Sequence, residues 1–107
     1  MNAEEKDALF WDLAQPMLLS GTADKGTMMG FPCLRTQGKF FASLEKDSKD
    51  LIVKLPAPRV SELIDAGEAQ PFAPNGRKFK EWALIDQADE QKWASYLEEA
   101  QTFVVNE

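Results

Sequence analysis

The sequence contains no histidine and a single cysteine, Cys33, among its 107 residues. One cysteine cannot form an internal disulfide, and a zinc site of the usual Cys/His kind needs more ligands than this chain offers. Ser-His-Asp and Cys-His catalytic arrangements are excluded as well, because each needs an imidazole as its base. Acid–base chemistry would fall to carboxylates, lysines or Tyr96, each in a strongly perturbing environment.

Two further patterns are missing. The six glycines are scattered through the chain and do not form a phosphate-binding loop of the Walker or Rossmann type. No apolar run approaches the roughly 20 residues that span a bilayer, and residues 2–7 lack the basic start of a secretory signal. We therefore expect a cytoplasmic protein that is not an enzyme and that has no cofactor, no metal and no membrane partner.

The residues that are present predict a helix at each end of one domain spanning residues 1–107. Apolar residues at helical spacing predict an amphipathic helix over residues 3–19, in which Pro16 is placed to kink or end the helix. Apolar residues at i, i+4, i+7 and i+11 from Trp93 predict a C-terminal helix capped by Asp86 or Asp89.

The middle of the chain is expected to form strands. Extended segments are predicted at residues 27–29, 31–36, 39–44, 50–55 and 78–85. The short turns between them favour an antiparallel meander, in which alternation would put Phe40 on the same face as Ala42, Leu51, Val53 and Leu55. Pro58 and Gly67 bound a short helix. The predicted fold is α+β, a mainly antiparallel sheet of about five strands with the N- and C-terminal helices packed on one face and a short helix between strands.

Several short motifs follow one another between residues 25 and 100. They are Met29-Gly30, Gly38-Lys39-Phe40-Phe41-Ala42, Leu51-Ile52-Val53-Lys54-Leu55, Gly67 with Pro71-Phe72, and the tryptophans Trp82 and Trp93. In order and spacing they resemble the N-terminal domain of the competence regulator TfoX, and more distantly the small YjbR-like (MmcQ) bacterial proteins. The resemblance implies a bacterial α+β protein tied to transcription regulation, with no catalytic residue to carry over. Met29 stands where that family commonly has phenylalanine.

Positive charge is concentrated in the middle of the chain. Ten of the twelve Lys and Arg residues lie between residues 25 and 80, against six acidic residues, whereas both ends are acidic. If the terminal helices cover one side of the sheet, we expect a basic, partly apolar surface on the other side. The candidate interaction surface consists of Arg35, Lys39, Phe41, Ile52 and Lys54, with Arg59, Arg77, Lys78 and Lys80 near its edges.

Three interpretations of this candidate surface stay open. In the simplest, its charges only solvate a sheet face and a loop. In the second, Phe41 and Ile52 form the apolar centre of an interface with an acidic protein partner or a second copy of the chain. In the third, the cations bind phosphates and Phe41 stacks on a base. A net charge of −6 opposes the approach of a polyanion, so protein interaction ranks above nucleic acid.

Four residues that could attract a functional interpretation are better explained by packing. We expect Cys33 to be a small apolar strand residue and not a nucleophile, because free cysteine is among the most buried residue types. Trp82 and Trp93 are expected in the core. Trp11 follows Phe10 on the first helix and so is expected at the edge of the core or in an interface.

Overall fold

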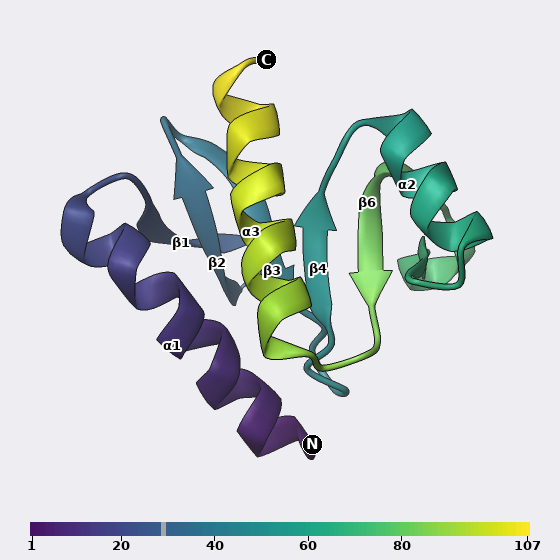
Figure 1. Cartoon of the computed structure of the whole chain (residues 1–107), viewed down its shortest axis with the longest axis horizontal. Helices are drawn as coiled ribbons and strands as arrows, with labels where there is room; N and C mark the ends of the chain where they lie inside the picture. Colours follow the sequence, from purple (N-terminus) through teal and green to yellow (C-terminus); the bar gives the residue numbers. More distant parts are fainter. Residues whose placement is uncertain (29) are drawn as a thin grey trace.

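A computed structural model describes residues 1–28 and 30–107 (Figure 1). The last residue of the strand predicted at residues 27–29, and the family difference noted at Met29, lie outside the described residues. The helices are α1 (Ala3–Ser20), α2 (Ala57–Asp65) and α3 (Glu90–Val105), with a 3₁₀ turn η1 (Pro74–Gly76). The strands are β1 (Asp24–Met28), β2 (Phe31–Thr36), β3 (Lys39–Leu44), β4 (Leu51–Lys54), β5 (Gln70–Phe72) and β6 (Phe79–Ile85).

The strands form one antiparallel sheet in the order β1-β2-β3-β4-β6-β5. The predicted α+β fold is confirmed, including the meander of β1 to β4. The sequence prediction of about five strands missed β5, which has only three residues and contains Pro71. Proline cannot donate to a strand ladder, and β5 accordingly lies at the edge of the sheet.

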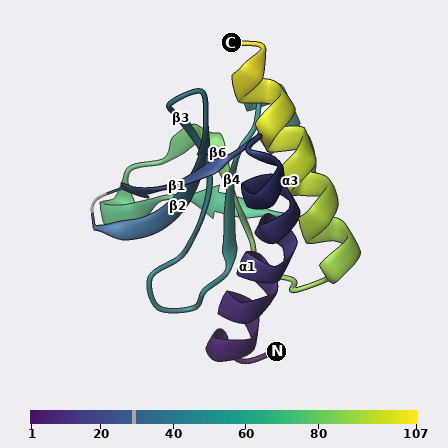
Figure 2. The same ribbon diagram turned by 90° about the vertical axis from the view of Figure 1, so that its left-hand side faces the viewer.

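Helices α1 and α3 cover one face of the sheet, as Figures 1 and 2 show, while α2 lies beside β6. The hydrophobic core fills the space between these two helices and the sheet and includes Phe10, Leu34, Val53, Trp93 and Leu97. In the described part of the chain, no α-helix covers the other face of the sheet (Figure 2). The predicted covering of one face is therefore confirmed.

Side chains close in the sequence cap the N-terminal ends of both terminal helices. Asn2 caps α1 by accepting the Glu5 backbone N–H at 2.8 Å, and the Glu5 carboxylate accepts the Asn2 N–H in return. Pro16 lies inside α1 without ending it, because it faces solvent, where water can replace the lost hydrogen bond. Of the two predicted caps of α3, Asp89 is the one that accepts a backbone N–H, from Lys92 at 3.0 Å.

A β-bulge changes the side-chain pattern of β3. Leu34 pairs with Ala42, but the next residue of β2, Arg35, pairs with Phe40, so Phe41 is an extra residue on β3. An extra residue breaks the alternation of side chains between the two faces of a strand. Phe41 and Ala42 therefore both belong to the core under the helices.

The bulge overturns two sequence predictions. Phe41, expected on the uncovered face, is 0% exposed within the core. Phe40, expected in the core, instead lies with Arg35 on the uncovered face, where a Cβ atom at Gly26 would stand 3.1 Å from Phe40 Cε1 and 3.1 Å from Arg35 Cδ. Strict alternation assigned the two phenylalanines to the wrong faces, because it assumes a ladder without an insertion.

Candidate functional site

A groove of about 580 Å³ lies on the face of the sheet that α1 and α3 leave uncovered. The alternation of side chains along β3 and β4 determines which residues form its floor. Ala42 and Val53 pair on the core face, so their neighbours Ser43 and Ile52, which also pair, point to the opposite face and line the groove. Ser43 Oγ donates to the Pro32 carbonyl at 2.9 Å, which leaves an apolar floor with its polar atom satisfied.

Four aromatic side chains from three strands line the groove: Phe31, Phe72, Phe79 and Trp82. The rings of Phe72 and Phe79 have centroids 5.9 Å apart. Their pairing requires a jump in register, because Pro71 pairs with Ala83 whereas Phe72 pairs with Phe79. Phe31 and Phe79 remain 42% and 40% exposed, so the groove presents aromatic surface to solvent.

Charged side chains stand at the edge of the groove. The guanidinium carbon of Arg77 lies 6.0 Å from the centre of the Phe79 ring, a distance that suits a cation–π contact. Glu45 also lines the groove, but its Oε1 accepts the Ser48 and Asp47 backbone N–H groups at 2.8 and 2.6 Å. These bonds lower the pKa of the Glu45 carboxyl and hold it in its own loop.

The chain matches no protein-family model, no curated protein and no solved structure. Function must therefore be inferred from the groove and its surroundings. Trp82 is a groove residue that sequence reasoning placed in the core, whereas it is half-buried and lines the groove. Its neighbour Ala83 pairs with Val53 on the core face, which turns Trp82 to the opposite face. Trp93 is fully buried in the core, as predicted.

Two predicted surface lysines hold the end of α3. Lys39 Nζ donates to the backbone carbonyls of Val104 and Glu107, each at 3.4 Å. Lys54 Nζ pairs with the Glu107 carboxylate at 3.0 Å. Cations beside the last carbonyls of a helix stabilise its terminus. Lys39 therefore contacts the helix layer, which corrects its predicted place on the uncovered face.

Two of the three arginines in the predicted surface are paired within the protein. Arg35 bonds the Asp24 carboxylate, with Nη2 at 2.8 Å. Arg59 bonds Glu99 through Nε at 2.8 Å and also pairs with Glu62, and the bond to Glu99 is the main reason why the pKa of Arg59 is raised. These pairs satisfy the positive charge that the sequence prediction left available for a partner.

Two residues of the predicted surface line the groove, and two more are close to it only along the chain. Ile52 forms part of its floor although it is only 4% exposed, and Arg77 stands at its edge. Lys78 and Lys80 are exposed and flank Phe79 along the chain. The structure thus brings Arg77 to the apolar floor, while Lys78 and Lys80 are not among the described lining residues. The other predicted residues, Arg35, Lys39, Phe41, Lys54 and Arg59, are engaged elsewhere.

Other reactive side chains are buried among packing residues. Burial raises the pKa of the Cys33 thiol, although the nearby Arg35 opposes the shift, and burial likewise raises the pKa of the Tyr96 hydroxyl. In residues 1–28 and 30–107, no group of three or more His, Cys, Asp or Glu side chains is placed to hold a metal ion. No helix in those ranges is long and apolar enough to cross a membrane.

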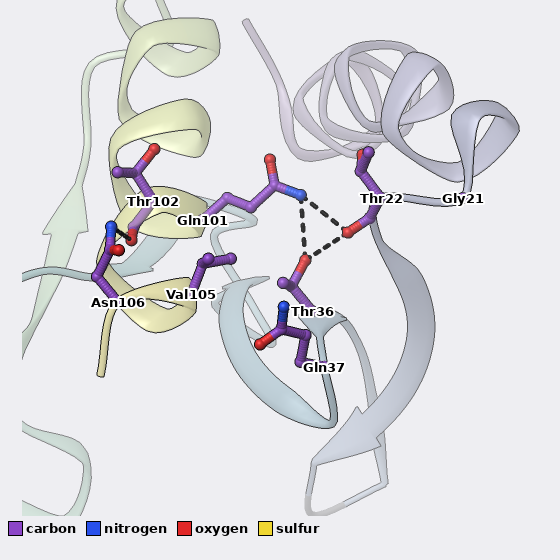
Figure 3. A pocket seen from close by; sticks show the side chains of 8 residues that line it. All are labelled: Gly21, Thr22, Thr36, Gln37, Gln101, Thr102, Val105 and Asn106. Atoms are coloured by element: carbon purple, nitrogen blue, oxygen red, sulfur yellow. Dashed lines mark hydrogen bonds between the residues drawn. The ribbon is translucent and has the colours of Figure 1, made fainter.

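A second hollow, of about 460 Å³, lies between the turn after α1, the turn after β2 and the end of α3 (Figure 3). Its polar atoms bond to one another. The Thr22 carbonyl accepts from Thr36 Oγ1 at 2.7 Å and from Gln101 Nε2 at 3.0 Å, and Gln101 Nε2 also lies 3.1 Å from Thr36 Oγ1. These bonds tie three elements together, so the hollow is best explained as part of the scaffold.

The substitution Thr36→Val tests this structural role. It keeps the shape of a buried side chain but removes the hydroxyl that bonds Thr22 and Gln101. We expect the free energy of unfolding to fall by about 1 kcal/mol, measured by urea denaturation. Thr102→Val, at the exposed rim of the same hollow, is the matched control and should change stability by less than about 0.5 kcal/mol. Equal urea midpoints for the two variants would contradict the role given to Thr36.

Proposed function

We propose that this is a cytoplasmic, non-catalytic protein-interaction module that holds an apolar stretch of a partner protein in its groove. A regulatory role would agree with the resemblance to the N-terminal domain of TfoX. The observation that carries the proposal is the groove itself, in which Phe31, Phe79 and Trp82 present aromatic surface around an apolar floor. Exposed aromatic surface with a polar rim is typical of interaction sites.

The size and lining of the groove support binding. Its volume of about 580 Å³ lies within the range of roughly 300–1,000 Å³ found for ligand pockets, which are mostly apolar with a few polar groups at defined places. Aromatic residues and arginine are also the side chains that most often dominate binding energy at protein interfaces. Arg77 beside Phe79 gives the groove one such pair.

The direction of the groove favours a side-chain mode of binding. Its lining comes from β2, β3, β4, β5 and β6 together with η1, so the groove crosses the strands. A bound peptide would therefore place side chains between the aromatic rings and would not extend the sheet as an added strand.

The pKa shifts of Cys33 and Tyr96 support a non-catalytic role. A reactive cysteine needs a lowered pKa to be a thiolate at neutral pH, whereas burial raises the pKa of Cys33. Burial raises the pKa of Tyr96 as well, which makes its phenolate rarer at neutral pH.

A peptide-display selection tests the proposal. A random peptide library is selected against the protein, and the enriched peptides are measured against Phe79→Ala and against Leu19→Ala. Leu19 is an exposed apolar residue on α1, away from the groove, and serves as the matched control. We expect enriched peptides rich in large apolar residues, with Phe79→Ala weakening their binding by about tenfold and Leu19→Ala leaving it unchanged.

Two results would contradict this function. In the first, the selection enriches no peptide that binds the soluble protein. In the second, the enriched peptides bind the Phe79→Ala variant as tightly as the parent, which would place their site away from the groove. Circular dichroism of both variants checks that the fold is intact.

Nucleic-acid binding is the second candidate function. The observation that favours it is the presence of Arg77 and Lys46 among the aromatic rings of the groove, because single-strand binders combine cations for phosphates with rings for bases. The net charge of −6 weighs against it, so the protein partner remains our first proposal.

A further inference from the structure

Most cations outside the groove are already engaged by the protein. Six side chains form ion pairs with carboxylates: Lys6, Arg35, Lys49, Lys54, Arg59 and Lys92. Lys39 bonds the carbonyls at the end of α3, and Lys25 Nζ lies 4.7 Å from the centre of a Trp11 ring. Eight of the twelve Lys and Arg side chains therefore have partners inside the molecule.

Four other cations remain. They are Lys46, Arg77, Lys78 and Lys80, and across the described part of the chain none of them forms an ion pair with a carboxylate. Lys46 and Arg77 line the groove, and the two lysines at 78 and 80 flank Phe79, which lines it too. Two of these four cations, Lys46 and Arg77, thus belong to the groove that presents exposed aromatic surface.

Positive charge exceeds negative charge in the described lining of the groove, because Lys46 and Arg77 are accompanied by one carboxylate. Glu45 is the single acidic residue among the described lining residues, and its Oε1 is occupied by the Asp47 and Ser48 backbone N–H groups. The acidic ends of the chain form α1 and α3, which cover the opposite face of the sheet. A short acidic ligand can therefore enter a locally positive site, whereas a long polyanion would meet the negative charge of the rest of the molecule.

Resting on the function proposed above, we infer that the partner of the groove is an acidic protein segment that carries large apolar side chains. Its apolar side chains pack between the aromatic rings over Ile52, and its carboxylates pair with Arg77 and Lys46. The planar guanidinium of arginine can bind a carboxylate through two parallel hydrogen bonds, which makes Arg77 the strongest anchor at the rim.

Synthetic peptides of one length test this inference. The first combines aspartate with phenylalanine, the second replaces each aspartate by lysine, and the third replaces each phenylalanine by alanine; a single-stranded DNA oligonucleotide is measured beside them. Binding is followed by calorimetry at low and physiological salt. We expect the first peptide to bind most tightly and to lose at least about fivefold in affinity with Arg77→Glu. Lys25→Glu, which changes the net charge equally at a site on the helix side, should leave binding almost unchanged.

Other outcomes separate this inference from the proposed function. If the lysine peptide binds as tightly as the aspartate peptide, and Phe79→Ala weakens both, the groove binds apolar segments but the acidic partner is wrong. If the oligonucleotide binds most tightly, with a steep loss on adding salt and on Arg77→Glu, the nucleic-acid function replaces both. If none of the peptides binds, the acidic partner is overturned, and the library selection decides whether the groove binds proteins at all.

Discussion

Trp93→Ala is expected to lower the free energy of unfolding by about 3–5 kcal/mol, the usual cost of removing a buried tryptophan or phenylalanine. Trp93 belongs to α3 and is 0% exposed, because it packs in the core between this helix and the sheet. Its Nε1 donates a hydrogen bond to the Gln87 carbonyl at 2.9 Å. Alanine would leave a cavity and remove one of the two hydrogen bonds that the Gln87 carbonyl accepts, the other coming from the Asp89 N–H. Because small domains are stable by only about 5–15 kcal/mol, the melting temperature followed by circular dichroism should fall markedly.

Trp82→Ala is the matched control for this experiment. Trp82 lines the groove and is half-buried, so its removal should cost clearly less than the removal of Trp93. Truncation of the chain before Trp93 removes the whole apolar face of α3 and is expected to unfold the domain. A Trp93→Ala variant that melts like the parent would mean that α3 is not packed on the sheet as described.

Phe41→Ala should destabilise the protein by about 3–5 kcal/mol, whereas Phe40→Ala should cost about 1 kcal/mol. The two residues are adjacent and chemically identical, so the comparison isolates the effect of the bulge. Phe41 lies fully within the core, while Phe40 lies half-buried beside Arg35 on the uncovered face. Urea denaturation of the two variants measures the difference.

The opposite order of stability would contradict the bulge. In a strand without an extra residue, Phe40 would share the core face with Ala42, and Phe40→Ala would then be the more damaging change. Equal losses would also disagree with the register, in which Arg35 pairs with Phe40 and Leu34 with Ala42.

The helices and the meander could be predicted because their signals are local. The spacing of apolar residues predicted α1 to within one residue of its end and predicted the presence of α3, for which Asp89 was one of two candidate caps. Short turns between extended segments predicted that β2, β3 and β4 pair in order along the chain. Each of these signals depends on residues only a few positions apart.

The candidate surface could be predicted only in part, because charge pairing joins distant residues. Arg59 and Glu99 are forty positions apart, and neither carries a sequence signal for the other. The same holds for Lys39 and Lys54, which meet the last residues of the chain. Sequence reasoning therefore counted as available several cations that the fold neutralises.

The sequence by itself determined the α+β class, the helices at both ends and the basic middle of the chain, since composition and short-range periodicity specify these features. Tertiary structure alone decided which phenylalanine enters the core, because a bulge at β3 depends on how two strands pair. It also decided that Trp82 and the segment at 77–80 meet Phe31 in one groove, because those residues come together only when β6 lies beside β4.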